Sequence, residues 1–144
     1  MGLAGTSFEA GNQLKIITQL ARHKTDRQRQ AVVLQNGKHA VTRVRVVQEL
    51  SGGAAAVVEC KLETGRTHQI RVHMSYVGHA LIGDQTYSRR RKLAGQHTEQ
   101  VAAFSRQALH AGLLGFKHPL TGRNLRFSAP LPKDMQDLIT LLSD

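Results

Sequence analysis

Two runs of alternating apolar and polar residues lie between positions 40 and 62, separated by a turn. Residues 40–50 alternate Val with Thr, Arg and Gln, and residues 54–62 form a second run rich in Ala and Val. Alternation with a period of two places the apolar side chains on one face of a β-strand. The Ser-Gly-Gly sequence at 51–53 supplies the turn between them. We therefore predict a β-hairpin with one buried face.

A helical pattern follows this hairpin. Ile70, Met74, Val77 and Leu81 recur at a spacing of three to four residues, which places them on one face of a helix. Thr67 is the predicted N-cap, because its hydroxyl can accept from the first free amides. Gly78 or Gly83 is predicted to end the helix.

The rest of the chain divides into shorter predicted segments. Residues 14–20 fit a short strand or a helical turn equally well, and 22–30 form a charged loop before a short apolar run at 31–34. Residues 88–98 read as a basic loop, 108–117 and 124–128 as a second hairpin, and 133–142 as a terminal helix that follows Pro132. The predicted fold class is α+β, with a mixed, mainly antiparallel sheet and flanking helices.

The charge balance favours a polyanionic partner. The 144 residues contain 20 Lys and Arg against 10 Asp and Glu, a formal net charge of +10. Such an excess is typical of nucleic-acid binding, although a merely soluble basic protein remains the alternative. Aromatic residues make up 4% of the chain and Trp is absent, which argues against a broad base-stacking platform. A monomer is expected.

The composition also bounds the setting. The longest apolar runs fall well short of 18 residues, so no membrane association is expected. Cys60 is the only cysteine, which excludes an intrachain disulfide and fits a reducing, cytoplasmic location.

Familiar metal and cofactor motifs are missing. The histidines His68, His73 and His79 are separated by five and six residues, whereas ligands on one helix face need spacings of three or four. The chain contains no glycine-rich phosphate-binding motif and no nucleophile elbow. We therefore predict no metal and no cofactor.

The segment at 62–74, Leu-Glu-Thr-Gly-Arg-Thr-His-Gln-Ile-Arg-Val-His-Met, concentrates polar side chains where a strand passes into a helix. Cationic Arg66 and Arg71 near a helix N-terminus oppose the helix dipole unless an anion binds there. A bound anion and a solvated basic face both remain open from the residues alone.

This segment closely resembles the third motif of the RluA-type RNA pseudouridine synthases. Further segments at 22–29, 37–46, 80–87, 106–111 and 127–135 resemble the same family in the same order. The resemblance covers residues 20–142, and the loop after Asn12 is similar to the branch that acts on large-subunit ribosomal RNA. It divides the chain into an unmatched lead at 1–19 and a partial synthase domain at 20–144, equivalent to the C-terminal half of the family's fold.

The resemblance implies an enzyme that isomerises uridine to pseudouridine in ribosomal RNA or tRNA without a cofactor. Such enzymes flip the target base out of its stack, and a catalytic Asp assists cleavage of the glycosidic bond. Arg71 aligns with the basic residue that pairs with this Asp, and Ile70 with an apolar residue near the uracil. The residues expected to contact RNA are Arg66, Thr67, His68, Gln69, Arg27 and Arg29. For Arg66, His68 and Gln69, orienting the strand-to-helix turn is an equally good interpretation.

One departure from the family limits these expectations. The catalytic Asp of the family lies in a His-Arg-Leu-Asp segment, and this sequence has none. Asp84 follows the third motif, but it reads as part of a Gly-Asp turn. We therefore expect a partial synthase that is inactive alone and pairs with RNA and with a separate N-terminal half. The alternatives are a non-catalytic RNA-binding remnant and an unstable product of a degenerate gene.

Overall fold

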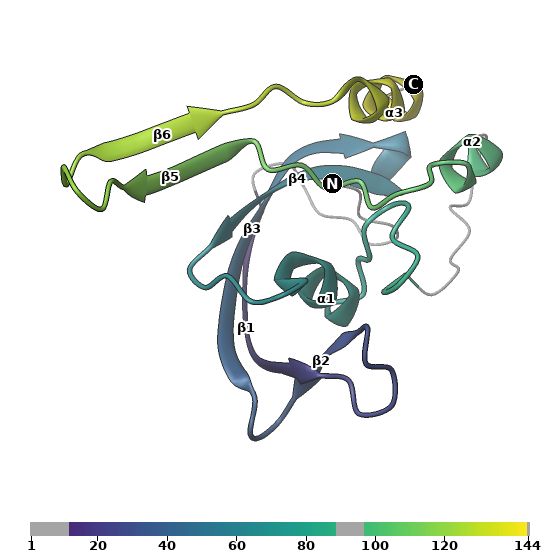
Figure 1. Cartoon of the computed structure of the whole chain (residues 1–144). Coiled ribbons are helices and arrows are strands. Elements are labelled where there is room, and N and C mark those ends of the chain that lie inside the picture. The colour runs from purple at the N-terminus through teal and green to yellow at the C-terminus, as the bar shows by residue number, and fades with distance from the viewer. Residues whose placement is uncertain (1–11, 89–96, 144) are drawn as a thin grey trace.

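The computed structural model describes residues 12–88 and 97–143, and its centre is a four-stranded antiparallel sheet (Figure 1). The strands are β1 (Gln13–Arg22), β2 (Gln30–Val33), β3 (Lys38–Leu50) and β4 (Ala55–Leu62), in the order β2-β1-β3-β4. The hairpin predicted from residues 40–62 is confirmed as β3 and β4, joined by a 3₁₀ turn at Ser51–Gly53.

The ambiguous segment at 14–20 is a strand. Its buried apolar residues, Ile16 and Leu20, are four positions apart, a spacing that suits one face of a strand as well as one face of a helix. Pairing with β3 decides the outcome, because Gln13 to Leu20 align with Arg45 to Lys38 along one continuous ladder. The boundary that we placed after residue 19 falls inside β1, so residues 13–19 belong to the same sheet as those that follow.

Strand β3 shows how the sheet divides core from solvent. Thr42, Val44 and Val46 are buried on the face that the helices cover. Arg43 and Arg45 point the other way and pair with glutamates across the β3–β4 ladder, at 3.1 Å and 3.2 Å. Exposed pairs of this kind contribute little to stability, so the buried face carries most of the folding free energy.

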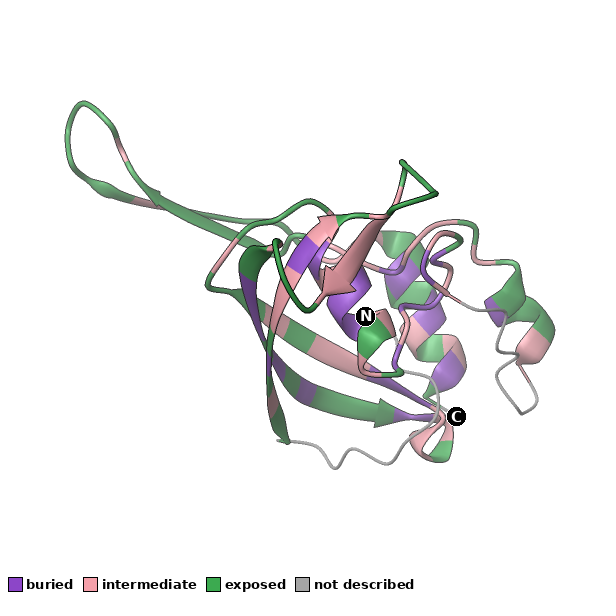
Figure 2. Ribbon diagram, turned by 90° about the horizontal axis from the view of Figure 1, so that it is seen from below, coloured by how far each residue is buried: buried purple, intermediate pink, exposed green. Residues whose placement is uncertain are grey.

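Helix α1 (Gln69–Tyr76) lies against the buried face of the sheet (Figures 1 and 2). The predicted apolar face is confirmed, since Met74 is buried and Ile70 and Val77 pack against the same cluster of sheet residues. Of the two predicted ends, the earlier one agrees with the structure: the helix ends at Tyr76, and Gly78 follows with a φ of 88°. Leu81 lies beyond the helix but is still buried.

The predicted N-cap, Thr67, is wrong. The capping position belongs to His68, whose φ is 55°, and no side chain caps the helix there. The side-chain carboxamide of Gln69 bonds to Thr64 and Arg66 of the turn instead, so the turn does not depend on a hydroxyl at Thr67.

Two further helices cover the end of the sheet near β4. The terminal helix α3 (Lys133–Leu142) is confirmed, and its buried Leu138 and Leu142 join a cluster with Leu50 and Ala55. Pro132 is the N-cap residue of α3, one position before the first turn in which we expected it. The short α2 (Thr98–Ala102) contributes Val101 to the same cluster, while residues 89–96 of the predicted basic loop lie outside the described part of the chain.

Strands β5 (Leu113–Lys117) and β6 (Asn124–Ser128) form a separate hairpin that projects from the body (Figures 1 and 2). Strand β5 starts five residues later than we predicted, because Ala108 is fully buried in the core and bonds to the carbonyl of Ile82. The rings of Phe116 and Phe127 stack across the hairpin with centroids 5.9 Å apart, yet both side chains stay about half exposed.

A buried histidine fastens α1 to the sheet. His73 is 0% exposed, and its Nε2 and Nδ1 lie 2.7 Å from the hydroxyls of Thr18 and Thr42. A neutral imidazole donates from one nitrogen and accepts at the other, so it can satisfy both hydroxyls. Burial lowers the pKa of His73 below its ordinary value, because the charged ring would lose its hydration.

This burial predicts a stability that falls with acidity. The unfolded chain protonates His73 near its ordinary pKa of about 6.5, whereas the folded protein resists protonation until lower pH. The unfolded state therefore binds more protons in that window, and the free energy of unfolding should decrease as pH falls from 7.5 to 5.5. Urea unfolding of the wild type and of His73→Gln measures the effect. The variant should be less stable at pH 7.5 but show a shallower pH slope. His39→Gln, at an exposed position, is the control, and equal slopes for wild type and His73→Gln would contradict the assignment.

Candidate functional site

The turn that joins β4 to α1 is built around the side chain of Gln69. Its Oε1 accepts from the Thr64 hydroxyl at 2.7 Å and from the Arg66 amide at 3.0 Å. Its Nε2 donates to the carbonyl of Val41 and to the hydroxyl of Thr42, both at 3.0 Å. Gln69 is 3% exposed, so it takes the structural role that the sequence left open and presents no free group to an RNA.

One turn into the helix, Arg71 forms a two-pronged ion pair with Asp84. Its Nε and Nη2 donate to Oδ2 and Oδ1 of the carboxylate at 2.8 Å and 3.0 Å. Oδ1 also accepts from the amides of Thr86 and Tyr87, each at 3.0 Å. Burial alone would raise the pKa of Asp84, but the bonds from Arg71 and from these amides outweigh it and hold the pKa below its usual value.

Tyr87 lies at the centre of the site. The guanidinium carbons of Arg71 and Arg29 lie 5.0 Å and 5.5 Å from the centre of its ring. Its hydroxyl accepts from the amide of Gln30 at 2.8 Å and lies 2.7 Å from Nδ1 of His68. Burial, and then the nearby Arg71 charge, lower the pKa of His68, which favours a neutral ring whose Nδ1 accepts the Tyr87 proton.

The charges around this ring do not balance. Arg29 and Arg71 bring two positive charges to this ring, and Asp84, which pairs with Arg71, brings one negative charge. Nε of Arg29 is buried without an acceptor among the described residues. Nη1 of Arg71 takes no part in the pair with Asp84 and is not one of these buried unpaired atoms. A buried guanidinium nitrogen without a partner is costly, so the arrangement suits one more anion, such as a carboxylate or a phosphate.

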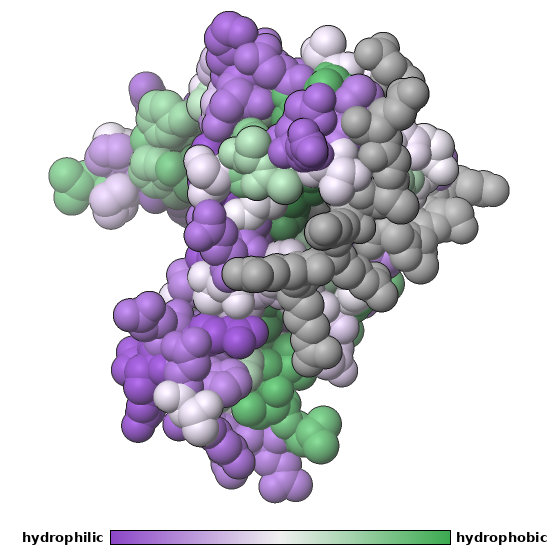
Figure 3. All heavy atoms as spheres, turned by 90° about the vertical axis from the view of Figure 1, so that its right-hand side faces the viewer, coloured by the Kyte–Doolittle hydropathy of each residue, from purple (hydrophilic) through white to green (hydrophobic). Residues whose placement is uncertain are grey.

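The other residues expected at the site are distributed over neighbouring surfaces. Ile70 is partly buried in the apolar cluster beneath α1. Arg66 and Thr67 are exposed and line a separate pocket beside β1 and β3, and Arg27 is exposed in the loop between β1 and β2. Hydrophilic side chains gather at the lower left of Figure 3, beside a hydrophobic area at the lower right, at the end of the molecule where Figure 1 places β2 and the loop before it.

Asp84 and Tyr87 were not among the predicted site residues. Both lie in the segment 80–87, which the resemblance already covered. The pairing of Asp84 with Arg71, 13 residues earlier, is seen only in the fold. Its Gly-Asp context looked like an ordinary turn. Burial, which is a property of the fold, makes this aspartate special, since its side chain is 0% exposed.

Two other classes of site find no support within residues 12–88 and 97–143. No group of three or more potential ligands there could hold a metal ion. The helices formed by these residues do not combine the length and the hydrophobicity that a membrane crossing requires.

Comparisons with known proteins identify the same family from several directions. Residues 6–76 match the family model described as RNA pseudouridylate synthase. Ribosomal large subunit pseudouridine synthase D of Zymomonas mobilis is 50% identical over 124 residues, which are 85% of this chain and 38% of that protein. An uncharacterized RNA pseudouridine synthase of Bacillus subtilis, YlyB, is 48% identical over 120 residues, 83% of this chain and 36% of the relative.

Solved structures show the same fold. Human RNA pseudouridylate synthase domain containing 1 superposes with a TM-score of 0.70 at 24% identity, covering 98% of this chain and 62% of that one. Human RNA pseudouridylate synthase domain containing 4 gives a TM-score of 0.65 at 22% identity, with coverages of 98% and 59%. The chain spans less than two fifths of the length of the curated relatives given above, 38% and 36%. By this family match and these identities, the chain belongs to the RNA pseudouridine synthase family.

Proposed function

We propose that this chain is the C-terminal part of a synthase that isomerises uridine to pseudouridine in large-subunit ribosomal RNA, in the cytoplasm and without a cofactor. The catalytic carboxylate would come from a segment that these 144 residues do not contain. The names of the relatives support RNA as the substrate class: the Zymomonas mobilis protein is named for the large ribosomal subunit, and the Bacillus subtilis protein for RNA in general. The net charge of +10 supports binding to a polyanion.

The observation that carries this proposal is the way Arg71 is held. Asp84 fixes one edge of the guanidinium through Nε and Nη2, and the Tyr87 ring lies 5.0 Å from its central carbon. Nη1 takes no part in the pair with Asp84. A second carboxylate arriving at that nitrogen would be kept ionised and oriented, which is what a catalytic Asp needs.

Asp84 is poorly placed to be the catalytic carboxylate itself. Its side chain is 0% exposed, and its two oxygens already accept from Arg71, Thr86 and Tyr87. A group that must reach the sugar or base of a flipped nucleotide needs a free oxygen at the surface. We assign Asp84 as a positioning residue that acts through Arg71.

The chain's own residues would then have distinct tasks in the reaction. Arg71 would orient the incoming carboxylate, and Tyr87 with His68 would hold the guanidinium plane in place. Arg27 and Arg66 would contact phosphates of the RNA. Such contacts help to offset the few kcal/mol that base flipping costs.

A second function, RNA binding without chemistry, has one specific observation in its favour. The Arg71–Asp84 pair is already complete in this chain, with two hydrogen bonds of 2.8 Å and 3.0 Å. The site is therefore formed without a catalytic carboxylate. A remnant that kept the basic surface would still bind RNA.

The next prediction tests a consequence that both functions share, the lack of a free catalytic carboxylate in this chain. The isolated chain should produce no pseudouridine from unmodified ribosomal RNA, because the carboxylate that bonds Arg71 within the described part of the chain, Asp84, is fully buried. Chemical detection of pseudouridine after incubation measures it. Turnover by the isolated chain that disappears in Asp84→Asn would instead make Asp84 the catalytic group.

The second prediction concerns affinity. Binding of a structured RNA should weaken steeply with salt, because each phosphate contact releases a counterion, and the logarithm of the association constant should fall linearly with the logarithm of salt. Fluorescence anisotropy at salt concentrations from roughly 50 to 200 mM provides the test. A flat response would remove the electrostatic basis of the proposal.

The third prediction concerns Asp84. Asp84→Asn should cost about 3–5 kcal/mol of unfolding free energy, since it leaves the largely buried Arg71 charge uncompensated. Arg71→Lys, made in the wild-type chain, should also lower the free energy of unfolding, because an ammonium cannot reproduce the two parallel bonds. Urea unfolding measures both variants.

Asp134→Asn is the matched control for that measurement. Asp134 also forms a two-pronged pair, with Arg106 at 2.8 Å for both bonds, but that pair is nearly half exposed. Its loss should matter far less, because water screens and solvates the groups left behind. Equal costs for Asp84→Asn and Asp134→Asn would show that burial does not strengthen the Arg71 pair.

A further inference from the structure

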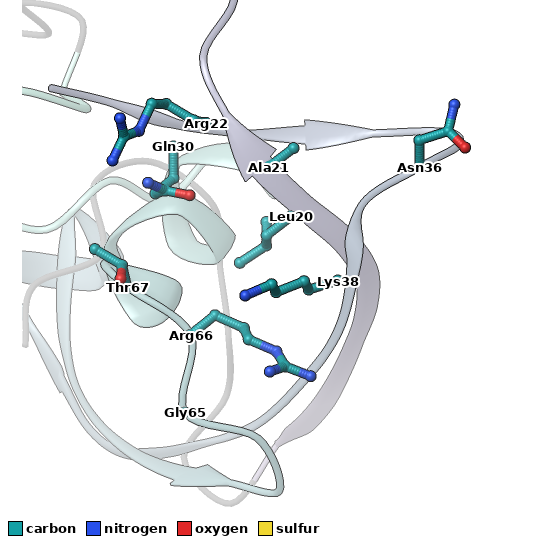
Figure 4. A pocket seen from close by; sticks show the side chains of 9 residues that line it. All are labelled: Leu20, Ala21, Arg22, Gln30, Asn36, Lys38, Gly65, Arg66 and Thr67. Carbon is teal, nitrogen blue, oxygen red and sulfur yellow. The ribbon is translucent and has the colours of Figure 1, made fainter. Parts of the chain in front are cut away.

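A second basic site lies at the end of the sheet, apart from Tyr87. It is a cavity of about 470 Å³ between strands β1 and β3 and the turn before α1 (Figure 4). Gln30 is shared with the Tyr87 site, since its backbone amide donates to the Tyr87 hydroxyl at 2.8 Å, whereas Arg71, Asp84 and Tyr87 do not line the pocket. The lining residues are Leu20, Ala21, Arg22, Gln30, Asn36, Lys38, Gly65, Arg66 and Thr67.

The lining of this pocket carries charge of one sign. Arg22, Lys38 and Arg66 line it, and no acidic residue does. None of the three forms an ion pair with a carboxylate in the described part of the chain. A concave surface lined by one sign of charge concentrates counterions, so it attracts an anionic ligand.

Arg66 is prepared for such a ligand. Its side-chain Nε donates to the carbonyl of His39 and its backbone amide to the side chain of Gln69, both at 3.0 Å. These bonds hold both ends of the residue and leave the terminal guanidinium nitrogens without a described acceptor. In Figure 4, Lys38 and Arg66 extend into the pocket from facing segments of the chain. Two guanidinium nitrogens in a fixed plane match two oxygens of a phosphate.

The lining also indicates what kind of anion fits. No aromatic ring and no carboxylate line the pocket. The three cationic side chains therefore favour a phosphate over a base or a sugar as the main group recognised. Contacts of this kind fix the register of a nucleic acid without reading its sequence.

We infer that the pocket formed by Lys38, Arg66 and Arg22 binds a backbone phosphate of the RNA. This inference rests on the proposed function and adds to it the place where the strand is held. Because Arg66 and Arg71 belong to the same turn and helix, a phosphate at Arg66 fixes the RNA relative to Arg71. The pocket governs affinity, and the Tyr87 site governs chemistry.

The experiment compares Lys38→Gln, Arg66→Gln and the double variant with the wild-type chain. The probe is a single-stranded RNA of mixed sequence, about 16 nucleotides long, which is the upper end of the site size of single-strand-binding folds. Lys117→Gln, on the exposed strand β5, is the matched control because it removes the same charge away from the pocket. Circular dichroism verifies that each variant is folded.

Each pocket substitution should lower the salt slope by about 0.7, which corresponds to about a fivefold loss of affinity at 0.1 M salt. The double variant should lose about the same slope as a single variant, because both side chains hold one phosphate, and Lys117→Gln should stay close to the wild type. Arg66→Lys should recover part of the affinity, because it restores the charge without the planar fork.

Other outcomes separate the two proposals. Wild-type binding to RNA with pocket variants that match Lys117→Gln would overturn the pocket and leave the proposed function standing. No RNA binding by the wild type would overturn both. A titration with inorganic phosphate, followed by amide shifts of residues 65–67, tests the source of the anion. Shifts with phosphate but none with RNA would make this a free-anion site and overturn the inference.

Discussion

The position of helix α1 depends on two polar side chains buried under it. Gln69 and His73 bond to Val41, Thr42 and Thr18 on the sheet, where apolar residues would be expected. Apolar packing tolerates small rotations and slides, because dispersion has no direction. Hydrogen bonds between buried groups do not tolerate them, since a misplaced donor or acceptor is left without water. The network thus holds the helix at one rotation, and with it the direction in which Arg66 and Arg71 leave the turn.

Two anion-seeking arginines therefore lie five residues apart in very different surroundings. Arg66 is exposed and its terminal nitrogens have no acceptor among the described residues, whereas Arg71 is 13% exposed and two of its donors bond to Asp84. Exposed cations attract a polyanion over long distances and release it readily as salt rises. A desolvated cation acts over short distances and with strict geometry. An enzyme that must both hold an RNA and place one carboxylate needs both kinds.

The sequence predicted the fold where one period dominated and failed where two were possible. Alternation identified β3 and β4, and helical spacing identified the apolar face of α1. Ile16 and Leu20, four residues apart, satisfied either period, and only the pairing with β3 decided between them. Ala108 looked like the start of a strand but is drawn into the core by a bond to Ile82.

Site residues divided along a similar line. Arg71 and His68 were recognisable because their segment resembles a family motif. Gln69 was indistinguishable in sequence from an RNA-contacting residue, because its burial arises from strands far away in the chain. Thr67 is a residue type that commonly caps helices, yet here the side-chain oxygen of Gln69 accepts from the Arg66 amide and holds the turn. Asp84 became notable only when the fold brought it to Arg71.

The projecting hairpin of β5 and β6 has a consequence for the breathing of the molecule. A two-stranded ribbon exposed on both faces is marginal by itself, and the β5–β6 pairing connects to the remainder through its ends. Its backbone amides should therefore exchange with solvent through a local opening that needs far less free energy than global unfolding. The protein then has two tiers of cooperativity, a firm sheet-and-helix unit and a ribbon that opens without it. A partner that covers the Phe116 and Phe127 rings would slow this exchange first. The exchange rate of the β5–β6 amides would therefore show whether the rest of a whole synthase contacts the hairpin.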